Sequence, residues 1–253
     1  MSEHRCIITV GLEIGGRTPA ADILDAAGFD WTHSYGGPHW EDDATRVALR
    51  GVSAILAGSE HFDATTLEDT DALQVIARNG VGYDKVDLDY CTNRGIVVTY
   101  APGVMADAVA DLTFALLLAM VRHVATGDRA VKAGDYNVPI GEDLPSMTLG
   151  LLGCGRIGAE TVRRAKGFRM RVLVHDPFVD ADSLQQMGVE PVDRATLLAE
   201  ADAISLHVPL SADNANIVDA EFLGSMKRGS YLINTARGGL VDEASLLDAL
   251  NRR

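Results

Sequence analysis

The feature that most restricts the fold of this chain is a group of glycines between an apolar strand and a helix-forming stretch. Residues 148–158 read Thr-Leu-Gly-Leu-Leu-Gly-Cys-Gly-Arg-Ile-Gly, which places G-x-G-x-x-G directly after a strand-like sequence. Gly153 permits a tight turn, Gly155 lets the backbone approach a pyrophosphate, and Gly158 lets the helix pack on the strand. The helix N-terminus offers unpaired N–H groups to phosphates. The pattern predicts a dinucleotide-binding α/β unit.

An acidic residue at the end of the next strand indicates which dinucleotide is bound. Asp176 lies eighteen residues beyond Gly158, where a carboxylate accepts hydrogen bonds from the adenosine ribose and repels a 2′-phosphate. The alternative is that Asp176 only begins the Asp-Pro turn. Cys154 is more consistent with a small filler of the motif than with a nucleophile. The predicted cofactor is NAD, and the motif's predicted cofactor-binding residues are Gly153, Gly155, Arg156, Ile157, Gly158 and Asp176.

Apolar, β-branched runs alternate with amphipathic stretches along the whole chain, which is typical of parallel sheets covered by helices. Strands are expected at 6–10, 53–57, 73–77, 96–100, 148–152, 171–174, 204–208 and 231–234. Helices are expected at 19–27, 41–49, 85–94, 105–123, 159–166, 195–199 and 243–250. Ala-Pro-Gly at 101–103 interrupts the pattern, and a polar stretch occupies 133–145. We expect two doubly wound α/β domains, 1–101 and 102–253.

Composition narrows the class of protein. The net charge of -14 disfavours binding to nucleic acid, because phosphate neutralisation requires a basic surface. Three widely separated cysteines indicate reduced thiols in a cytoplasm, and no His or Cys cluster has metal-ligand spacing. The most apolar run, 112–121, has about half the length of a membrane span and is interpreted as a buried helix.

Further motifs carry a family resemblance. Residues 76–87, with Gly-Ile-Val-Val at 95–98, resemble the substrate-domain signature of the D-2-hydroxyacid dehydrogenases, phosphoglycerate dehydrogenases among them. Leu-His-Val-Pro-Leu at 206–210 and Ile-Asn-Thr-Ala-Arg-Gly-Gly-Leu-Val-Asp-Glu at 233–243 resemble two more of its signatures. The resemblance implies a flavodoxin-like substrate-binding domain, a Rossmann NAD-binding domain, and hydride transfer between a 2-hydroxy acid and nicotinamide. It also implies a homodimer formed through the cofactor domain. The apolar helix around 112–121 is a candidate contributor to the dimer, and the alternative is a helix buried within its own domain.

The resemblance also assigns roles to individual residues. Arg237 binds the substrate carboxylate and polarises the carbonyl, which suits a permanently charged, forked guanidinium. Val81 and Gly82 offer backbone N–H groups to the same carboxylate. Taken alone, Arg237 could form a surface salt bridge, and the loop at 80–82 could be a flexible turn. The nicotinamide side is lined by Val208, Pro209, Thr235 and Ala236, which taken alone would be packing at strand ends.

The family's catalytic histidine, and the glutamate that orients it, follow the arginine motif at positions beyond Arg253. We therefore expect a fragment of a longer dehydrogenase or the product of an interrupted reading frame, which binds NAD weakly and turns over little substrate. His207 is the one histidine placed to substitute as the acid. The alternatives are an NAD(H)-binding regulatory protein, like the corepressors that share this fold, or an inactive remnant.

Two smaller departures concern the substrate and one helix. Phosphoglycerate-type members carry a basic residue in the loop after the second predicted strand, where this chain reads Gly-Ser-Glu-His-Phe at 58–62. An acid at this position disfavours a phosphorylated substrate. Ala-Val-Ala-Asp at 108–111 replaces the more usual Ser-Val-Ala-Glu, and the sequence does not indicate what this changes.

Overall fold

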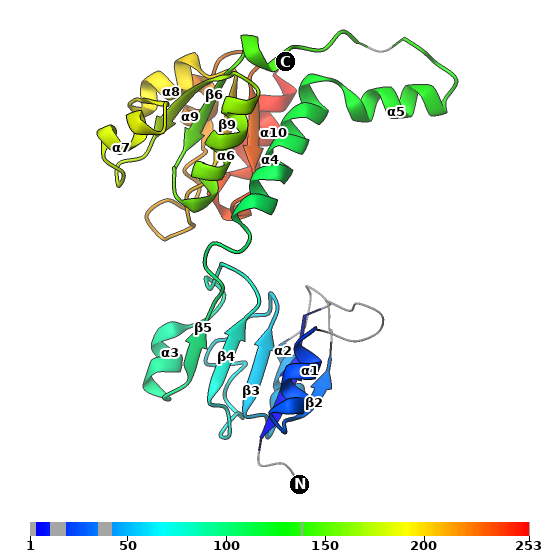
Figure 1. Ribbon diagram of the computed structural model, residues 1–253, viewed down its shortest axis with the longest axis vertical. Coiled ribbons are helices and arrows are strands. Elements are labelled where there is room, and N and C mark those ends of the chain that lie inside the picture. Colours follow the sequence, from blue (N-terminus) through cyan, green and yellow to red (C-terminus); the bar gives the residue numbers. More distant parts are fainter. Residues whose placement is uncertain (1–3, 11–18, 35–41, 138, 253) are drawn as a thin grey trace. The chain divides into compact units, whose positions relative to one another are not determined.

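The computed structural model of the chain describes residues 4–10, 19–34, 42–137 and 139–252. The chain divides into two compact units, Met1–Val104 and Met105–Arg253 (Figure 1). Each unit contains one five-stranded parallel sheet with helices packed against it. The prediction of two α/β units built on parallel sheets is therefore confirmed.

The sheet of the first unit has the strand order β2-β1-β3-β4-β5. The chain thus adds one strand on one side of β1 and then continues on the other side, so the direction changes between β1 and β3. Ligands of doubly wound sheets bind outside the carboxyl ends of the strands at such a switch point. The strands are β1 (Arg5–Ile8), β2 (Asp30–His33), β3 (Ala54–Ala57), β4 (Val75–Arg78) and β5 (Val97–Thr99).

Helices α1 (Pro19–Ala26), α2 (Asp42–Leu49) and α3 (Leu88–Asn93) complete this unit. The helix expected at 41–49 is described from residue 42, because position 41 lies outside the described residues. Ile7, Ile55 and Ile76 of the three central strands are buried in one apolar cluster with Leu49 of α2 and Cys91 of α3. The strand β2 was not predicted. It is a half-exposed edge strand, and the sequence Asp-Trp-Thr-His carries no apolar run.

The sheet of the second unit has the strand order β10-β9-β6-β7-β8. If the five strands are numbered in chain order from β6, and the sheet is read from its β8 edge, the order is 3-2-1-4-5, as in dinucleotide-binding sheets. The switch point lies between β6 and β9. The pairings β6–β7 and β6–β9 are both parallel and in register. The strands are β6 (Thr148–Leu152), β7 (Arg171–His175), β8 (Glu190–Pro191), β9 (Ala203–Leu206) and β10 (Tyr231–Asn234).

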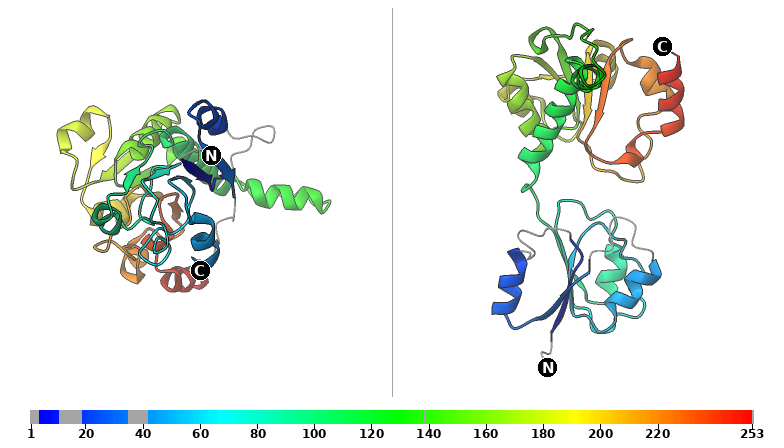
Figure 2. Two further views of the ribbon diagram at one scale, coloured as in Figure 1. Left: turned by 90° about the horizontal axis from the view of Figure 1, so that it is seen from below. Right: turned by 90° about the vertical axis from the view of Figure 1, so that its right-hand side faces the viewer.

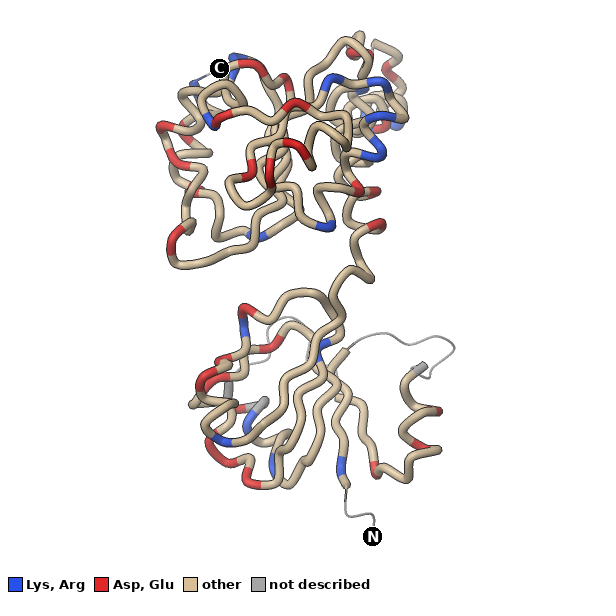
Figure 3. The backbone as a smooth tube through the Cα atoms, turned by 60° about the vertical axis from the view of Figure 1, so that its left-hand side comes forward, with Lys and Arg blue, Asp and Glu red and all other residues tan. Residues whose placement is uncertain are grey.

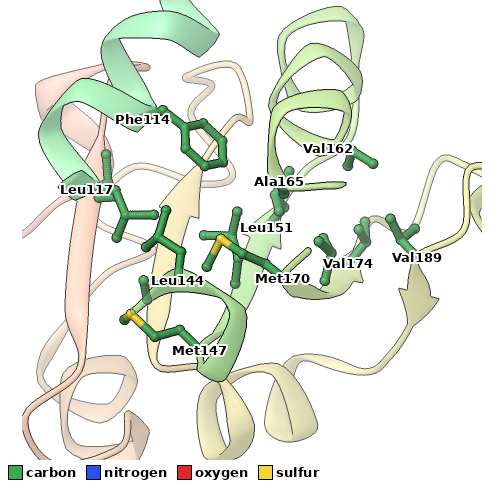
Figure 4. Packing of buried hydrophobic residues seen from close by; sticks show 14 of the residues in the cluster. Phe114, Leu117, Leu144, Met147, Leu151, Val162, Ala165, Met170, Val174 and Val189 are labelled. Carbon is green, nitrogen blue, oxygen red and sulfur yellow. The ribbon is translucent and has the colours of Figure 1, made fainter. Parts of the chain in front are cut away.

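Helices cover both faces of this sheet. They are α4 (Ala106–Val121), α5 (Val124–Lys132), α6 (Arg156–Gly167), α7 (Ala181–Gln186), α8 (Arg194–Glu200), α9 (Ala220–Ser225) and α10 (Glu243–Asn251), with short 3-10 turns η1 (Leu144–Ser146) and η2 (Gly238–Leu240). One apolar cluster contains Leu149 and Leu151 of β6 with Phe114 and Leu117 of α4, as Figure 4 shows in part. A second cluster packs Leu206 of β9 against α8 and α9. A doubly wound sheet needs two such apolar layers.

The helix expected at 105–123 is two helices. His123 takes a left-handed conformation with φ of 53°, which ends α4 and starts α5. Left-handed backbone is unfavourable for residues other than glycine and interrupts a helix. Within the described residues, no single helix is long and apolar enough to cross a membrane. The bent pair of α4 and α5, joined at 58°, meets those criteria only when it is counted together.

An ion-pair network ties α4 to α6 and includes Asp111, the last residue of the departure at 108–111. The guanidinium of Arg164 on α6 donates to Asp111 at 2.6 Å and to Asp107 at 2.9 Å, and it also pairs with Glu160. The side chain of Arg164 is only 15% exposed. Asp111 therefore acts as a helix-to-helix partner of Arg164. Acidic positions elsewhere are distributed over both units (Figure 3), which agrees with the negative net charge.

Candidate functional site

The glycine loop between β6 and α6 folds as the motif requires. Gly153 has a positive φ of 91°, and a Cβ atom there would lie 2.8 Å from Val208 Cγ1. A Cβ atom on Gly158 would lie 2.8 Å from the carbonyl oxygen of Gly153. Both positions therefore exclude any side chain on steric grounds. Gly155 differs, because its φ of -69° is ordinary and a Cβ atom would meet nothing within 4 Å. The side of the loop at Gly155 is thus open to a ligand.

The N-terminus of α6 is available to an anion. Four other helices of this unit begin with an aspartate whose carboxylate accepts a hydrogen bond from a backbone N–H of the first turn; the four are Asp180, Asp193, Asp219 and Asp242. At α6 the N-cap is Gly155, which supplies no such bond. The next residues are Arg156, which is exposed, and Ile157. Uncapped N–H groups and the helix dipole favour a phosphate at this position.

Asp176 holds the glycine loop from the neighbouring strand. Its Oδ2 accepts a hydrogen bond of 2.7 Å from the N–H of Cys154, and its Oδ1 accepts one of 2.9 Å from the N–H of Phe178. The second hydrogen bond closes the Asp-Pro turn that Asp176 begins, as the alternative interpretation of this residue predicts. The carboxylate thus stands at the carboxyl end of β7 beside the loop. Burial and the nearby Asp176 charge raise the pKa of the Cys154 thiol to about 11, which keeps it protonated and unreactive.

The carboxyl end of β9 contributes the next part of this edge. Val208 touches the glycine loop, and the carbonyl oxygen of Pro209 accepts a hydrogen bond of 2.6 Å from Asn214. The backbone N–H of His207 donates to the Leu152 carbonyl oxygen. Its Nε2 atom is buried and finds no hydrogen-bond partner among the described residues. Burial lowers the pKa of His207 to about 4, so the imidazole is neutral at pH 7 and lacks the imidazolium proton that a general acid would release.

Asn234 shapes the carboxyl end of β10 and was missed by the sequence reasoning. Its Oδ1 accepts from the N–H of Ala236 at 3.0 Å, while its Nδ2 donates to the Arg237 carbonyl oxygen at 2.8 Å. Thr235 is held from α4, because its hydroxyl lies 3.1 Å from that of Thr113. An Asn at the end of a strand is a known turn signal, and it could have identified this pair of hydrogen bonds.

Arg237 is half-buried at the start of η2, and its Nη1 donates to the Ala236 carbonyl oxygen at 2.9 Å. The turn after it packs against the end of β9, since a Cβ atom on Gly239 would lie 3.0 Å from Leu210 Cδ2. Gly153, Asp176, Val208 and Arg237 therefore follow four neighbouring strands at the same carboxyl edge of one sheet.

In the first unit, Val81 and Gly82 lie on the loop that follows β4. Arg78 braces this loop by donating from Nε to the Gly82 carbonyl oxygen at 3.1 Å. The N–H groups of Val81 and Gly82 make no hydrogen bond to another described residue, so they are available to an external acceptor. This matches the chemistry that a carboxylate-binding loop requires.

The second unit fits a dinucleotide. Open space beside Gly155, uncapped N–H groups at α6 and an acid at the end of β7 suit a pyrophosphate and a ribose. Across the described ranges of the chain, no group of three or more His, Cys, Asp or Glu side chains could hold a metal ion.

Comparison with known proteins agrees with this geometry. Residues 114–253 match the family model of the D-isomer specific 2-hydroxyacid dehydrogenase, NAD binding domain. The chain belongs to this family. The family and the cofactor predicted from the motifs, NAD, are thereby confirmed. One relative, the glyoxylate reductase of Korarchaeum cryptofilum, is 42% identical over 224 residues, which cover 83% of this chain and 68% of that protein. Seven further curated relatives are covered over 34% to 64% of their length.

Solved structures of the family show the same fold. The TT0316 protein of Thermus thermophilus is 36% identical, with a TM-score of 0.88 over 98% of this chain and 78% of that one. A D-lactate dehydrogenase from Aquifex aeolicus, complexed with NAD and lactic acid, is 29% identical, with a TM-score of 0.83 over 98% of this chain and 74% of that one.

Proposed function

We propose that this chain binds NAD and a small 2-keto or 2-hydroxy acid, as part of an NAD-dependent dehydrogenase that interconverts the two by hydride transfer. The observation that carries the proposal is the shared carboxyl edge of the second sheet. There the glycine loop after β6, Val208 after β9 and Arg237 after β10 follow neighbouring strands. NAD, when bound, would accept or donate the hydride.

Each predicted residue receives a defined task in this proposal. Gly153, Gly155, Arg156, Ile157 and Gly158 hold the pyrophosphate, and Asp176 binds the adenosine ribose. Val208, Pro209, Thr235 and Ala236 line the nicotinamide. Arg237 binds the substrate carboxylate through its guanidinium fork, and Val81 and Gly82 donate backbone hydrogen bonds to a carboxylate. A keto group that is reduced also takes up a proton, which the neutral His207 does not supply.

Binding measurements with variants of Arg237 test the proposal. NADH is titrated into the chain first, and pyruvate is then titrated into the NADH complex by isothermal calorimetry. Arg237→Ala is expected to weaken the binding of pyruvate by about 10- to 100-fold, while the affinity for NADH changes by no more than about twofold. Arg237→Lys should recover only part of the loss, because an ammonium lacks the bidentate fork.

Arg228 is the matched control, since it is exposed and precedes β10, at the opposite end of the strand from Arg237. Arg228→Ala should leave both affinities unchanged. Equal pyruvate binding by the wild type and Arg237→Ala would remove the assigned role. Turnover of 2-keto acids by the same samples, followed through NADH absorbance, tests the enzymatic part of the proposal.

We also propose that the second unit forms a homodimer through α4 and α5. Helix α5 projects from the sheet of its unit (Figure 1 and the left view of Figure 2) and buries no side chain. Val131 is 51% exposed, and Tyr136 and Ile140 just beyond α5 are 84% and 97% exposed. Exposed large apolar side chains at and beyond a projecting helix favour a partner. Val131→Asp should shift the mass measured by light scattering from dimer to monomer, whereas Ile23→Asp on exposed α1 should not.

The proposed compartment is the cytoplasm. It is supported by the three cysteines, all of which are unpaired thiols in the structure.

A further inference from the structure

Helices α8 and α9 of the second unit enclose a groove that the proposed function does not use. The two helices pack against each other (Figure 1), and the groove between them has a volume of about 570 Å³. Pockets for small molecules in proteins have volumes of about 300–1,000 Å³. None of the residues that line this groove is among those assigned above to NAD or to the substrate. The groove is therefore a candidate for a second binding site.

Apolar side chains form the floor of the groove. Leu198 of α8 and Phe222 of α9 line it, and they are only 4% and 0% exposed because they also belong to the apolar core. Ala195 and Ala199 line it one helical turn apart on α8, and both are exposed. Since each carries only a methyl group, they leave room above the floor. An apolar group of a ligand would be favourably buried there.

A guanidinium is held in place at this groove. Arg194 Cζ lies 5.2 Å from the centroid of the Phe222 ring, and Arg194 Nη2 donates to the Ile217 carbonyl oxygen at 3.3 Å. Arg194 forms no ion pair within the described part of the chain. The acid before it, Asp193, accepts a hydrogen bond of 2.7 Å from the Thr196 N–H. The remaining N–H groups of Arg194 can therefore bind a carboxylate through the guanidinium fork.

Helix α9 contributes groups that suit a cation. Glu221 lines the groove, is exposed, and forms no ion pair with a basic side chain of the described residues. Ser225 lines it one turn further along α9 and is also exposed. A carboxylate and a hydroxyl group both accept hydrogen bonds from an ammonium group. The groove thus combines a fixed positive charge, a negative charge and an apolar floor.

We infer that this groove binds a free α-amino acid with a short apolar side chain, of the size of leucine or valine. Arg194 binds the carboxylate, Glu221 binds the ammonium group, and the side chain lies on the apolar floor. Both charges of a zwitterion then meet the opposite charge, whereas a simple carboxylic acid leaves Glu221 unmatched and a simple amine leaves Arg194 unmatched. The inference does not depend on the proposed function, because neither Arg237 nor the glycine loop takes part.

Isothermal calorimetry on the whole chain without NADH tests the inference. L-leucine is compared with two analogues that each lack one charge, 4-methylpentanoate and isoamylamine. A ligand of this size is expected to bind with a Kd of about 1 mM. Each analogue should bind at least about tenfold more weakly, and so should L-leucine to Arg194→Ala or Glu221→Gln. Ala199→Phe fills the groove without removing a charge, so it should abolish the binding of L-leucine.

Arg228→Ala and Glu243→Gln are matched controls, because both residues are exposed in the same unit and neither lines the groove. Arg237→Ala should also keep the affinity for L-leucine, which separates the groove from the proposed substrate site. Far-UV circular dichroism during urea unfolding verifies that each variant keeps the second unit folded.

Three results would overturn the inference: no binding of L-leucine by the wild type, equal binding of 4-methylpentanoate and L-leucine, or loss of L-leucine binding in Arg237→Ala. None of them decides the proposed function, which the pyruvate titrations test separately.

Discussion

Two glycines of one loop are expected to respond in opposite ways to the same substitution. Gly153→Ala forces a side chain into a positive φ of 91°, and its Cβ atom lies 2.8 Å from Val208 Cγ1 and 3.0 Å from the His207 carbonyl carbon. The conformational strain is about 1–2 kcal/mol, and overpacking adds about 1–3 kcal/mol. The second unit should therefore lose about 2–5 kcal/mol of unfolding free energy.

Gly155→Ala adds the same methyl group where the backbone tolerates it. The φ of -69° is allowed for alanine and no atom lies within 4 Å of the new Cβ. The stability change should stay within about 1 kcal/mol, and loss of glycine entropy in the unfolded chain favours a small gain. The methyl group does occupy the open side of the loop, so NADH affinity should fall at least about tenfold, which is about 1.4 kcal/mol.

The assay separates the two units without any label. Both tryptophans, Trp31 and Trp40, precede residue 105, so tryptophan fluorescence follows unfolding of the first unit alone. Far-UV circular dichroism follows both units. Gly153→Ala should lower the urea midpoint of the dichroism transition assigned to the second unit and leave the fluorescence transition in place. Equal destabilisation by the two substitutions, or unchanged NADH affinity in Gly155→Ala, would refute the assignment of the loop.

Three other predictions concern the second unit. Asp176→Ser should narrow the preference for NADH over NADPH by about tenfold or more in a fluorescence titration, because it removes a negative charge that would face the 2′-phosphate. Arg164→Ala should lower the unfolding free energy measured in urea by about 1–2 kcal/mol, whereas Arg163→Ala, whose side chain is 65% exposed, should leave the urea midpoint almost unchanged. The pKa of His207 is lowered from 6.5 to about 4, so the unfolded chain takes up this proton first and stability falls as pH drops through that window. His207→Asn should flatten this part of the pH profile of the unfolding midpoint, and an unchanged slope would contradict the burial argument.

The fold was predictable wherever an element carries an apolar run. The strands β6 and β10 were predicted with their observed bounds, and β3 within one residue, because each carries a short apolar run. The strands β2 and β8 were missed, since their few residues are half-exposed or exposed and carry no apolar run. Helices α7 and α9 were missed although each begins with a capping aspartate, Asp180 or Asp219. That signal was present in the sequence and was not used.

The candidate site was predictable where a motif fixes the backbone. Gly153, Gly155 and Gly158 have conformations or contacts that their pattern implies. Asn234 was not assigned a role, although its contacts are local to the turn after β10 and an asparagine at the end of a strand is a turn signal. The acid in the loop 58–62 was predicted only to disfavour a phosphorylated substrate, and its burial was not predicted. Glu60 in particular is a charged residue type that is rarely buried without a partner, so the sequence gives no reason to expect it at 7% exposure.

The buried cysteines give each unit a thiol whose rate of modification reports how often that unit opens. Cys6 and Cys91 lie in the first unit and Cys154 in the second, and all three are buried. Only an exposed thiolate reacts readily with disulfide or maleimide reagents, so the rate of native-state modification measures how often each unit opens. Mass spectrometry of peptides carrying Cys154 would report opening at the glycine loop, and bound NADH should slow it. A cysteine introduced on the surface could also be labelled with a fluorophore while the three native thiols stay in place.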